Sequence, residues 1–217
     1  MRRPSNYDKF PTIRVGEAEE CEAGWDAIAA TLASATREGR ALCICCYPGV
    51  FTDEVLQALR ARLRSCAFFQ ADDCLRPPEE LRSVISSLLG DDRVFGRMSN
   101  LSLEDYFDTQ KLEGMRTEII QAAARQPAIV VGAGASLVSP DDAVLVYADM
   151  ARWEIQLRWR RTELGNFGLN NRDADFAAKY KCGFFAEWRA ADGMKKTLLP
   201  KLDFILDTNT PMQPKLI

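Results

Sequence analysis

The sequence contains no histidine among its 217 residues. Histidine is the commonest metal ligand and the commonest general acid or base near neutral pH. Its absence excludes a Ser-His-Asp or Cys-His catalytic site within this chain. Any chemistry must therefore use carboxylates, arginine, lysine, cysteine or a bound cofactor.

Long apolar runs and a strong excess of one charge are also absent. No run approaches the roughly 18 apolar residues of a membrane-spanning helix, and the basic N-terminus lacks the apolar core of a signal peptide. The net charge of −3 gives no general case for binding nucleic acid or an anionic membrane. Seven cysteines, an odd number without secretory features, favour reduced thiols. We expect a cytoplasmic protein with neither nucleic acid nor a membrane as partner.

Lysine is missing between Lys9 and Lys111, which affects the interpretation of CYPGVFTDEV at residues 46–55. This segment stands between a predicted strand and a predicted helix, where a phosphate-binding loop would lie. Such a loop needs glycines for amide access, a lysine for the β- and γ-phosphates, and Ser or Thr for magnesium. Only Gly49 and Thr52 meet these needs. The segment predicts an ordinary strand–turn–helix corner with little or no ATP-dependent phosphoryl transfer, and Thr52 is a plausible helix N-cap.

Short apolar runs alternate with amphipathic segments along the chain, which predicts an α/β fold with a mainly parallel sheet. The runs expected as strands are residues 41–47, 67–71, 128–131, 143–147, 182–188 and 202–208. Helices are expected over residues 17–37 and 53–64, after Pro77, after a capping box at 102–105, and after Asp149. The link 132–142 is too short for a full crossover helix, so the strands around it should be non-adjacent or antiparallel, unless the link crosses over as an irregular loop.

We divide the chain into four segments. Residues 1–16 are an N-terminal arm, 17–164 the α/β core, 165–209 a loop and β-hairpin extension of the same domain, and 210–217 a linker-like tail. In the extension, residues 182–188 and 202–208 would pair around a turn at Asp192-Gly193.

Two sets of polar residues are candidate sites. Asp72 and Asp73 follow a predicted strand, where paired acids could hold magnesium or accept a hydroxyl proton; solvated turn residues are the alternative. Asp149 also ends a strand and precedes a cationic helix. An anion would bind between Asp149 and three arginines of that helix, unless these are simply a solvated face: Arg152, Arg158 and Arg161. Trp153 and Leu157 are expected to anchor the helix.

Two other patterns are rejected as sites. Gly132-Ala-Gly134 resembles the start of a dinucleotide fingerprint, but another strand follows without room for the required helix, so the glycines indicate a tight strand exit. Cys43, Cys45 and Cys46 lie within one predicted strand and lack zinc-site spacing, so they are interpreted as core residues.

The order of these segments over residues 40–164 resembles the uridine kinase and phosphoribulokinase group of P-loop kinases. The likeness implies a three-layer P-loop-kinase-like sandwich. It would put Asp72 or Asp73 in the place of the catalytic aspartate, and Arg152, Arg158 and Arg161 in the lid. The chain departs from the group in lacking the phosphate-loop lysine.

A second likeness spans nearly the whole chain. Residues 5–11, 91–98, 147–160, 179–196 and 206–209 resemble the N-terminal portion of bacterial class I mannose-6-phosphate isomerase proteins, where a kinase-like region precedes a zinc-dependent cupin domain. This sequence contains no cupin segment, and the zinc of those proteins is expected on histidines and a glutamate.

These likenesses imply a non-catalytic module that works with a cupin-type isomerase domain, fused or separate, and binds a sugar phosphate or nucleotide. Zinc would belong to the associated isomerase, so no metal or cofactor is expected within this chain. The alternative is an active small-molecule kinase with an unusual phosphate loop, which would use Mg-ATP.

Overall fold

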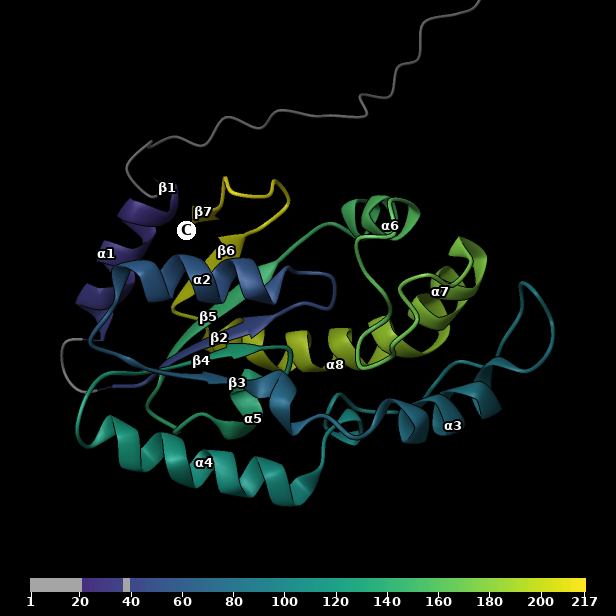
Figure 1. Cartoon of the computed structure of the whole chain (residues 1–217), viewed down its shortest axis with the longest axis horizontal. Coiled ribbons are helices and arrows are strands. Elements are labelled where there is room, and N and C mark those ends of the chain that lie inside the picture. The colour runs from purple at the N-terminus through teal and green to yellow at the C-terminus, as the bar shows by residue number, and fades with distance from the viewer. Residues whose placement is uncertain (1–20, 37–39) are drawn as a thin grey trace, which may run out of the picture.

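The computed structural model describes residues 21–36 and 40–217, and its strands form one sheet in the order β1-β7-β6-β5-β2-β4-β3 (Figure 1). Neighbours from β6 to β3 are parallel, whereas β7 is antiparallel to both β6 and β1. The strands are β1 (Glu22–Ala23), β2 (Leu42–Cys46), β3 (Ala67–Gln70), β4 (Ala128–Gly132), β5 (Val144–Asp149), β6 (Phe204–Asp207) and β7 (Lys215–Leu216).

Helices connect these strands and extend beyond one edge of the sheet. The α-helices are α1 (Trp25–Ala35), α2 (Thr52–Arg62), α3 (Pro78–Leu89), α4 (Thr109–Ala123), α5 (Ala135–Val138), α6 (Arg152–Arg160), α7 (Phe176–Cys182) and α8 (Trp188–Leu198). Short 3₁₀ helices are η2 (Ala71–Cys74), η3 (Glu104–Tyr106) and η5 (Leu199–Lys201), and η4 (Gly183–Glu187) is a π-helical turn.

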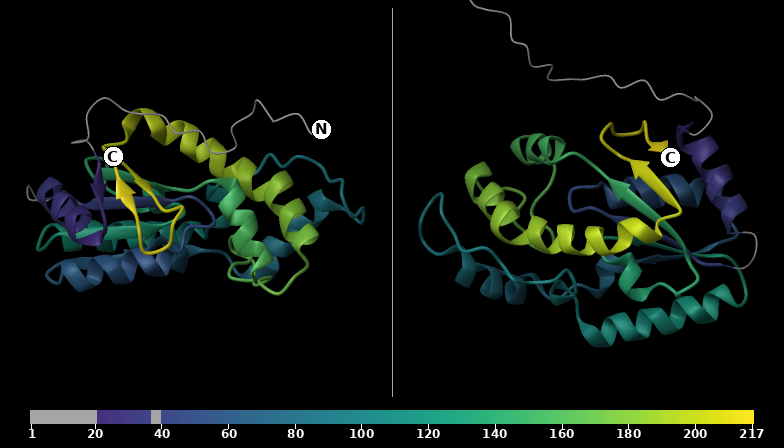
Figure 2. Two further views of the ribbon diagram at one scale, coloured as in Figure 1. Left: turned by 90° about the horizontal axis from the view of Figure 1, so that it is seen from above. Right: turned by 180° about the vertical axis from the view of Figure 1, so that it is seen from behind.

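The sheet is covered on both faces. Helices α1 and α2 lie on one face, joined by an ion pair between Asp26 and Arg62, and α8 lies on the other, where Ser136 of α5 contacts Met194 (Figure 2). Helices α3, α6 and α7 lie beyond the carboxyl ends of the strands (Figure 1). The fold is therefore the three-layer α/β sandwich with a mainly parallel sheet that the sequence predicts.

Every residue of strand β2 is buried, as is every residue of its neighbour β4. Strand β2 pairs in parallel with β4 on one side and β5 on the other. The strands around the short link 132–142 are thus non-adjacent, as predicted, and the link holds only the four residues of α5. Cys43, Cys45 and Cys46 are all buried in the main core, which confirms their interpretation as core residues.

The predicted strand at residues 182–188 is wrong. These residues end α7, form the π-helical turn η4 and begin α8. A short apolar run cannot by itself distinguish a buried strand from a buried helix. Here Cys182, Ala186 and Ala190 recur every four residues and pack into a second, smaller core. This spacing places the three side chains on one face of a helix, so the segment is helical.

The C-terminal segment therefore differs from the expected hairpin. Asp192 and Gly193 lie inside α8 rather than in a turn. The antiparallel pair at this end is β6 with β7, and residues 210–217 are not a simple linker because β7 joins the sheet between β6 and β1.

Two helix starts also differ from expectation. Helix α1 begins at Trp25 rather than residue 17, and α4 is capped by Asp108, whose carboxylate accepts from the Lys111 amide at 3.0 Å. Ser102 and Asp105 do bond to each other, but Asp105 belongs to η3 and not to the first turn of α4. The predicted arm, residues 1–16, lies outside the described residues. Of the helices within 21–36 and 40–217, none has the length and apolarity required to span a bilayer.

Candidate functional site

A cleft of about 360 Å³ opens where β2, β3 and β4 end. The loop 47–51 after β2, the first turn of α2, and the residues following β3 and β4 form its walls. Residues 163–167, which follow α6, form a further wall. Open parallel sheets bind ligands at this edge, so we call this space the first cleft.

The loop 47–51 takes the place of a phosphate loop and is closed on one side by α6. Gly49 has φ +108°, and a Cβ there would lie 2.7 Å from Ile155 Cγ1, so only glycine fits. Gly49 and Thr52 both line the first cleft, as the sequence suggests. Thr52 is the first residue of α2 and Phe51 precedes it without a side-chain cap, so the predicted N-cap role of Thr52 is wrong.

Asp72, in η2, is the buried acid of the first cleft. Its Oδ1 atom is inaccessible to solvent and has no hydrogen-bond partner among the described residues. Burial, with the nearby charges of Asp73 and Asp53, raises the pKa of Asp72 to about 7, against the effect of the Ala133 amide. The tight exit of β4 makes room for it, because a Cβ on Gly132 would lie 2.8 Å from Asp72 Oδ1.

The charges around the first cleft are all of one sign. Asp53, Asp72 and Glu163 line it, and no lysine or arginine is among its lining residues in the described part of the chain. Carboxylates accept hydrogen bonds from hydroxyls and amines but repel phosphate. The first cleft therefore suits the hydroxyl-bearing part of a ligand better than a triphosphate.

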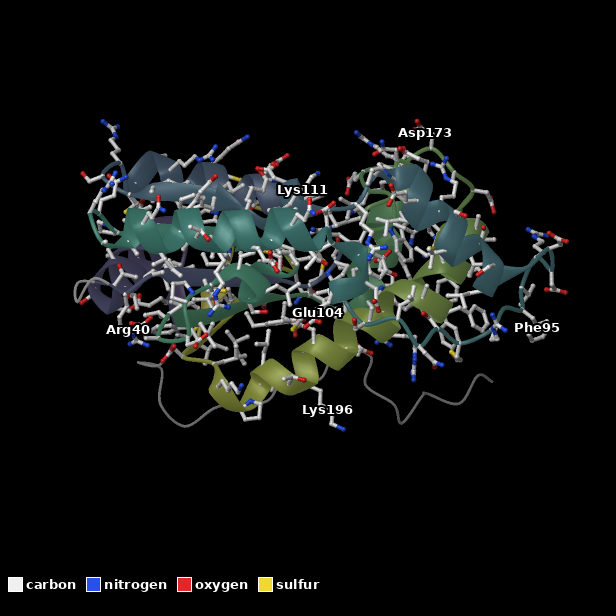
Figure 3. All side chains as sticks on the ribbon, turned by 90° about the horizontal axis from the view of Figure 1, so that it is seen from below. Arg40, Phe95, Glu104, Lys111, Asp173 and Lys196 are labelled. Carbon is white, nitrogen blue, oxygen red and sulfur yellow. The ribbon has the colours of Figure 1, made fainter. Side chains whose placement is uncertain are left out.

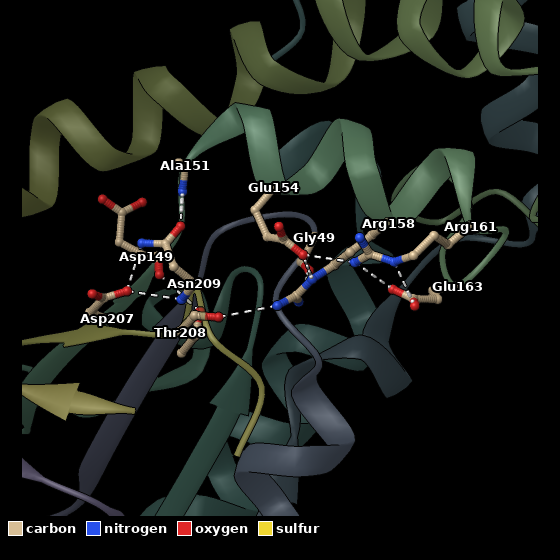
Figure 4. Close-up of polar contacts among 10 residues, drawn as sticks. All are labelled: Gly49, Asp149, Ala151, Glu154, Arg158, Arg161, Glu163, Asp207, Thr208 and Asn209. Carbon is tan, nitrogen blue, oxygen red and sulfur yellow. Dashed lines mark hydrogen bonds and ion pairs between the residues drawn. The ribbon is translucent and has the colours of Figure 1, made fainter. Parts of the chain in front are cut away.

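Arg158, one of the predicted anion-binding residues, is held inside the protein (Figure 4). Its side chain is only 1% exposed. It donates to the carbonyl oxygens of Gly49 at 2.8 Å and Thr208 at 3.1 Å, and its guanidinium lies 3.9 Å from the centre of the Phe51 ring. Arg158 thereby ties the loop 47–51 to the end of β6.

Arg158 on α6 and Arg161 directly after that helix are neighbours, as helical spacing predicts, but both pair with Glu154 of the same chain (Figure 4). Glu154 lies 2.8 Å from Arg161 Nη2 and 3.4 Å from Arg158 Nε. Arg161 also pairs with Glu163 at 2.8 Å, and this bond holds the pKa of Glu163 below its usual value.

Arg152 and Asp149 have separate internal partners. Arg152 pairs with Asp192 and Tyr47 and lies over the Trp188 ring at 4.9 Å. Asp149 pairs with Lys195. The structure therefore does not bring Asp149 and the three arginines together around one open site.

The face by which α6 packs also differs from expectation. Trp153 is 61% exposed, whereas Ile155, Arg158 and Trp159 are buried. Trp159 stacks on Trp188 with ring centres 5.4 Å apart. The apolar face of α6 is thus shifted by about half a turn from the predicted one.

Residues 163–170, here called the strap, are fixed by two buried charged side chains. The Lys179 ammonium donates to the carbonyl oxygen of Leu164 in the strap at 3.4 Å, and to those of Trp159 at 2.8 Å and Arg172 at 2.7 Å on either side of it. Glu187 accepts from Asn166 Nδ2 at 2.9 Å and from the Phe167 amide at 3.0 Å. Neither Lys179 nor Glu187 was predicted as a functional residue. The feature that could have indicated them is a charged residue within a mostly apolar segment.

A second cleft, of about 450 Å³, adjoins the first at Asp72. Asp73 lines it, together with Arg76, Lys111 and strap residues 168–170. The sequence reasoning did not identify Arg76 or Lys111. Lys111 could have been noticed because no other lysine stands between it and Lys9 in the sequence.

A family model described as a domain of unknown function (DUF8485) matches residues 24–217. The chain belongs to the DUF8485 family. A search of the curated proteins found no match. The DUF8485 match begins at Gly24, so it includes every residue that lines either cleft.

The DUF8485 region contains no group of three or more Cys, Asp and Glu side chains arranged to hold a metal ion, within the residues that the structure describes.

Proposed function

We propose that this chain is a non-catalytic, degenerate P-loop-kinase-like module that binds a sugar phosphate, or the sugar part of a nucleotide, at the first cleft. The observation that carries the proposal is the position of Asp72, a half-buried carboxylate that lines the first cleft. Its Oδ1 atom is inaccessible to solvent, so a ligand hydroxyl would donate to the more exposed part of the carboxylate. A hydrogen bond to such a charged group contributes about 1.5–3 kcal/mol.

The surroundings of Asp72 support a ligand rich in hydroxyls. Asp53 and Glu163 line the same cleft and add further acceptors. The loop 47–51 contains no lysine, and the Gly49 carbonyl is already engaged by Arg158. Phosphoryl transfer depends on positioning and charge neutralisation around the phosphates, so these features argue against catalysis.

The alternative is an active small-molecule kinase that uses Mg-ATP. It is favoured by the position of Asp72 in the first cleft at the end of β3, where burial raises the pKa of this carboxyl to about 7, since a general base works best when its pKa is near the operating pH. Robust turnover of a nucleoside or sugar with ATP, abolished by Asp72→Asn, would select this alternative.

The association with a cupin-type mannose-6-phosphate isomerase domain stays a prediction that rests on the sequence resemblance. Co-elution of the purified chain with such a domain in size-exclusion chromatography would support it. Separate elution at concentrations of tens of micromolar would count against a stable complex.

Calorimetric titration tests the proposed binding. Mannose 6-phosphate, fructose 6-phosphate and ATP are titrated into the wild type, Asp72→Asn and the control Asp91→Asn, which changes an exposed acid. We expect a hexose phosphate to bind, with affinity lowered about tenfold in Asp72→Asn by loss of one charged hydrogen bond. Affinity should rise from pH 6 to 8, because the ionised carboxylate is the better acceptor. Equal affinity in wild type and Asp72→Asn would refute the site.

A further inference from the structure

The two clefts share one wall residue and one covering segment. Asp72 lines both. The strap also lines both, with residues 163–167 at the first cleft and 168–170 at the second. A ligand that reaches Asp72 from the first cleft therefore has an adjoining space for a second group.

The second cleft supplies the cations that the first lacks. Arg76 Nε donates to the Phe107 carbonyl at 3.0 Å, and Lys111 Nζ to the Leu75 carbonyl at 3.3 Å. Neither forms an ion pair with a carboxylate of the described residues. Their positive charges remain available to an anion, and arginine and lysine are the usual phosphate-binding side chains.

Acidic groups oppose these cations. Pro77 and Pro78, which have no amide hydrogen, line the second cleft at the N-terminus of the 12-residue helix α3, and Glu79 and Glu80 stand in the first turn of that helix. The end of α3 therefore adds nothing to anion binding. Asp73 is the opposing charge in the cleft beside the shared Asp72.

We infer that the second cleft is a phosphate subsite, and that one phosphomonoester spans both clefts. Its hydroxyl-bearing body donates to Asp72 from the first cleft, and its phosphate binds Arg76 and Lys111 in the second. This inference rests on the proposed function and deepens it, since it makes the phosphate a determinant of affinity and places it away from the loop 47–51.

Matched lysine variants test the phosphate subsite. Figure 3 shows Lys111 on α4 and Lys196 on α8, and both are exposed. Calorimetry compares mannose 6-phosphate with mannose, and AMP with adenosine, in the wild type, Lys111→Gln, Arg76→Gln and Lys196→Gln. We expect the phosphorylated member of a pair to bind the wild type at least about tenfold more tightly. Lys111→Gln and Arg76→Gln should remove most of this preference without changing the affinity for the unphosphorylated member, and Lys196→Gln should change neither.

The outcomes separate the subsite from the proposed function. Equal affinity of the wild type for both members of each pair, or an undiminished preference in Lys111→Gln and Arg76→Gln, would overturn the phosphate subsite and leave binding at Asp72 intact. Failure of all four compounds to bind the wild type would reject the proposed function and this inference with it. Thermal melts of each variant confirm that the fold is retained.

Discussion

Glu187→Gln should remove a pH-dependent loss of stability that the buried Glu187 carboxyl imposes. Glu187 is 2% exposed on the π-helical turn η4. Burial raises its pKa from 4.5 to about 7, partly opposed by the hydrogen bonds from Asn166 and Phe167. Between these two pH values the folded protein holds a proton that the unfolded chain has released, so stability falls as pH rises.

The pKa values set the size of this effect. At about 1.4 kcal/mol per pKa unit, a rise from 4.5 to about 7 means that Glu187 lowers the free energy of unfolding by about 3 kcal/mol between pH 4.5 and 8. Glutamine cannot ionise, and its amide oxygen can still accept from Asn166 and Phe167. The variant should therefore lose less stability than the wild type over this range, by about 3 kcal/mol.

Urea unfolding at pH 5, 6, 7 and 8 measures this difference directly. Asp72, whose pKa is also about 7, contributes a loss of the same sign in both proteins, so it cancels in the comparison. Glu104→Gln is the matched control, because it removes the same charge from an exposed 3₁₀ turn (Figure 3). Parallel stability curves for wild type and Glu187→Gln, within about 0.5 kcal/mol, would refute the reasoning.

Two further substitutions test the packing around α6. Arg158→Met should lower the free energy of unfolding by about 3 kcal/mol, because it leaves two main-chain carbonyls without donors, whereas Arg125→Met, on an exposed arginine, should have little effect in the same urea titration. Gly183→Ala should cost about 1–3 kcal/mol, since its Cβ would lie 2.4 Å from Trp159 Cη2. Gly193→Ala, with open space at its Cβ, should instead stabilise α8 by about 0.5–1 kcal/mol, and a loss equal to that of Gly183→Ala would contradict the packing argument.

The central sheet was predictable because its signals are local. Strands β2, β4 and β5 are continuous apolar runs, and burial on both faces needs no information beyond the run itself. The length of the link between β4 and β5 was enough to show that they are not direct neighbours in a parallel sheet.

The helix at residues 182–188 was not predictable in the same way. Its apolar run fits either a strand or a helix, and the choice depends on Trp159 and the second core, both distant in sequence. The error hid Glu187, since a carboxylate in a presumed strand gave no indication that it fixes the strap.

Much of the candidate site depends on pairings that sequence spacing cannot show. Asp72 and Gly49 were identified because strand ends form the functional edge of the sheet. Arg76 and Lys111 come from different elements and meet only when η2, α3 and α4 pack together. The arginines of α6 could be recognised in the sequence, but their pairing with Glu154 and Glu163 could not.

The contrast between α6 and the second cleft explains where phosphate should bind. A phosphate at Arg158 and Arg161 would have to displace Glu154 and Glu163, and Arg158 would also have to leave the Gly49 and Thr208 carbonyls. Expelling a carboxylate replaces one anion by another, so the gain in energy is small. At Arg76 and Lys111 a phosphate displaces no carboxylate from an ion pair. The cations without acidic partners are therefore the better site, although their sequence signal is the weaker one.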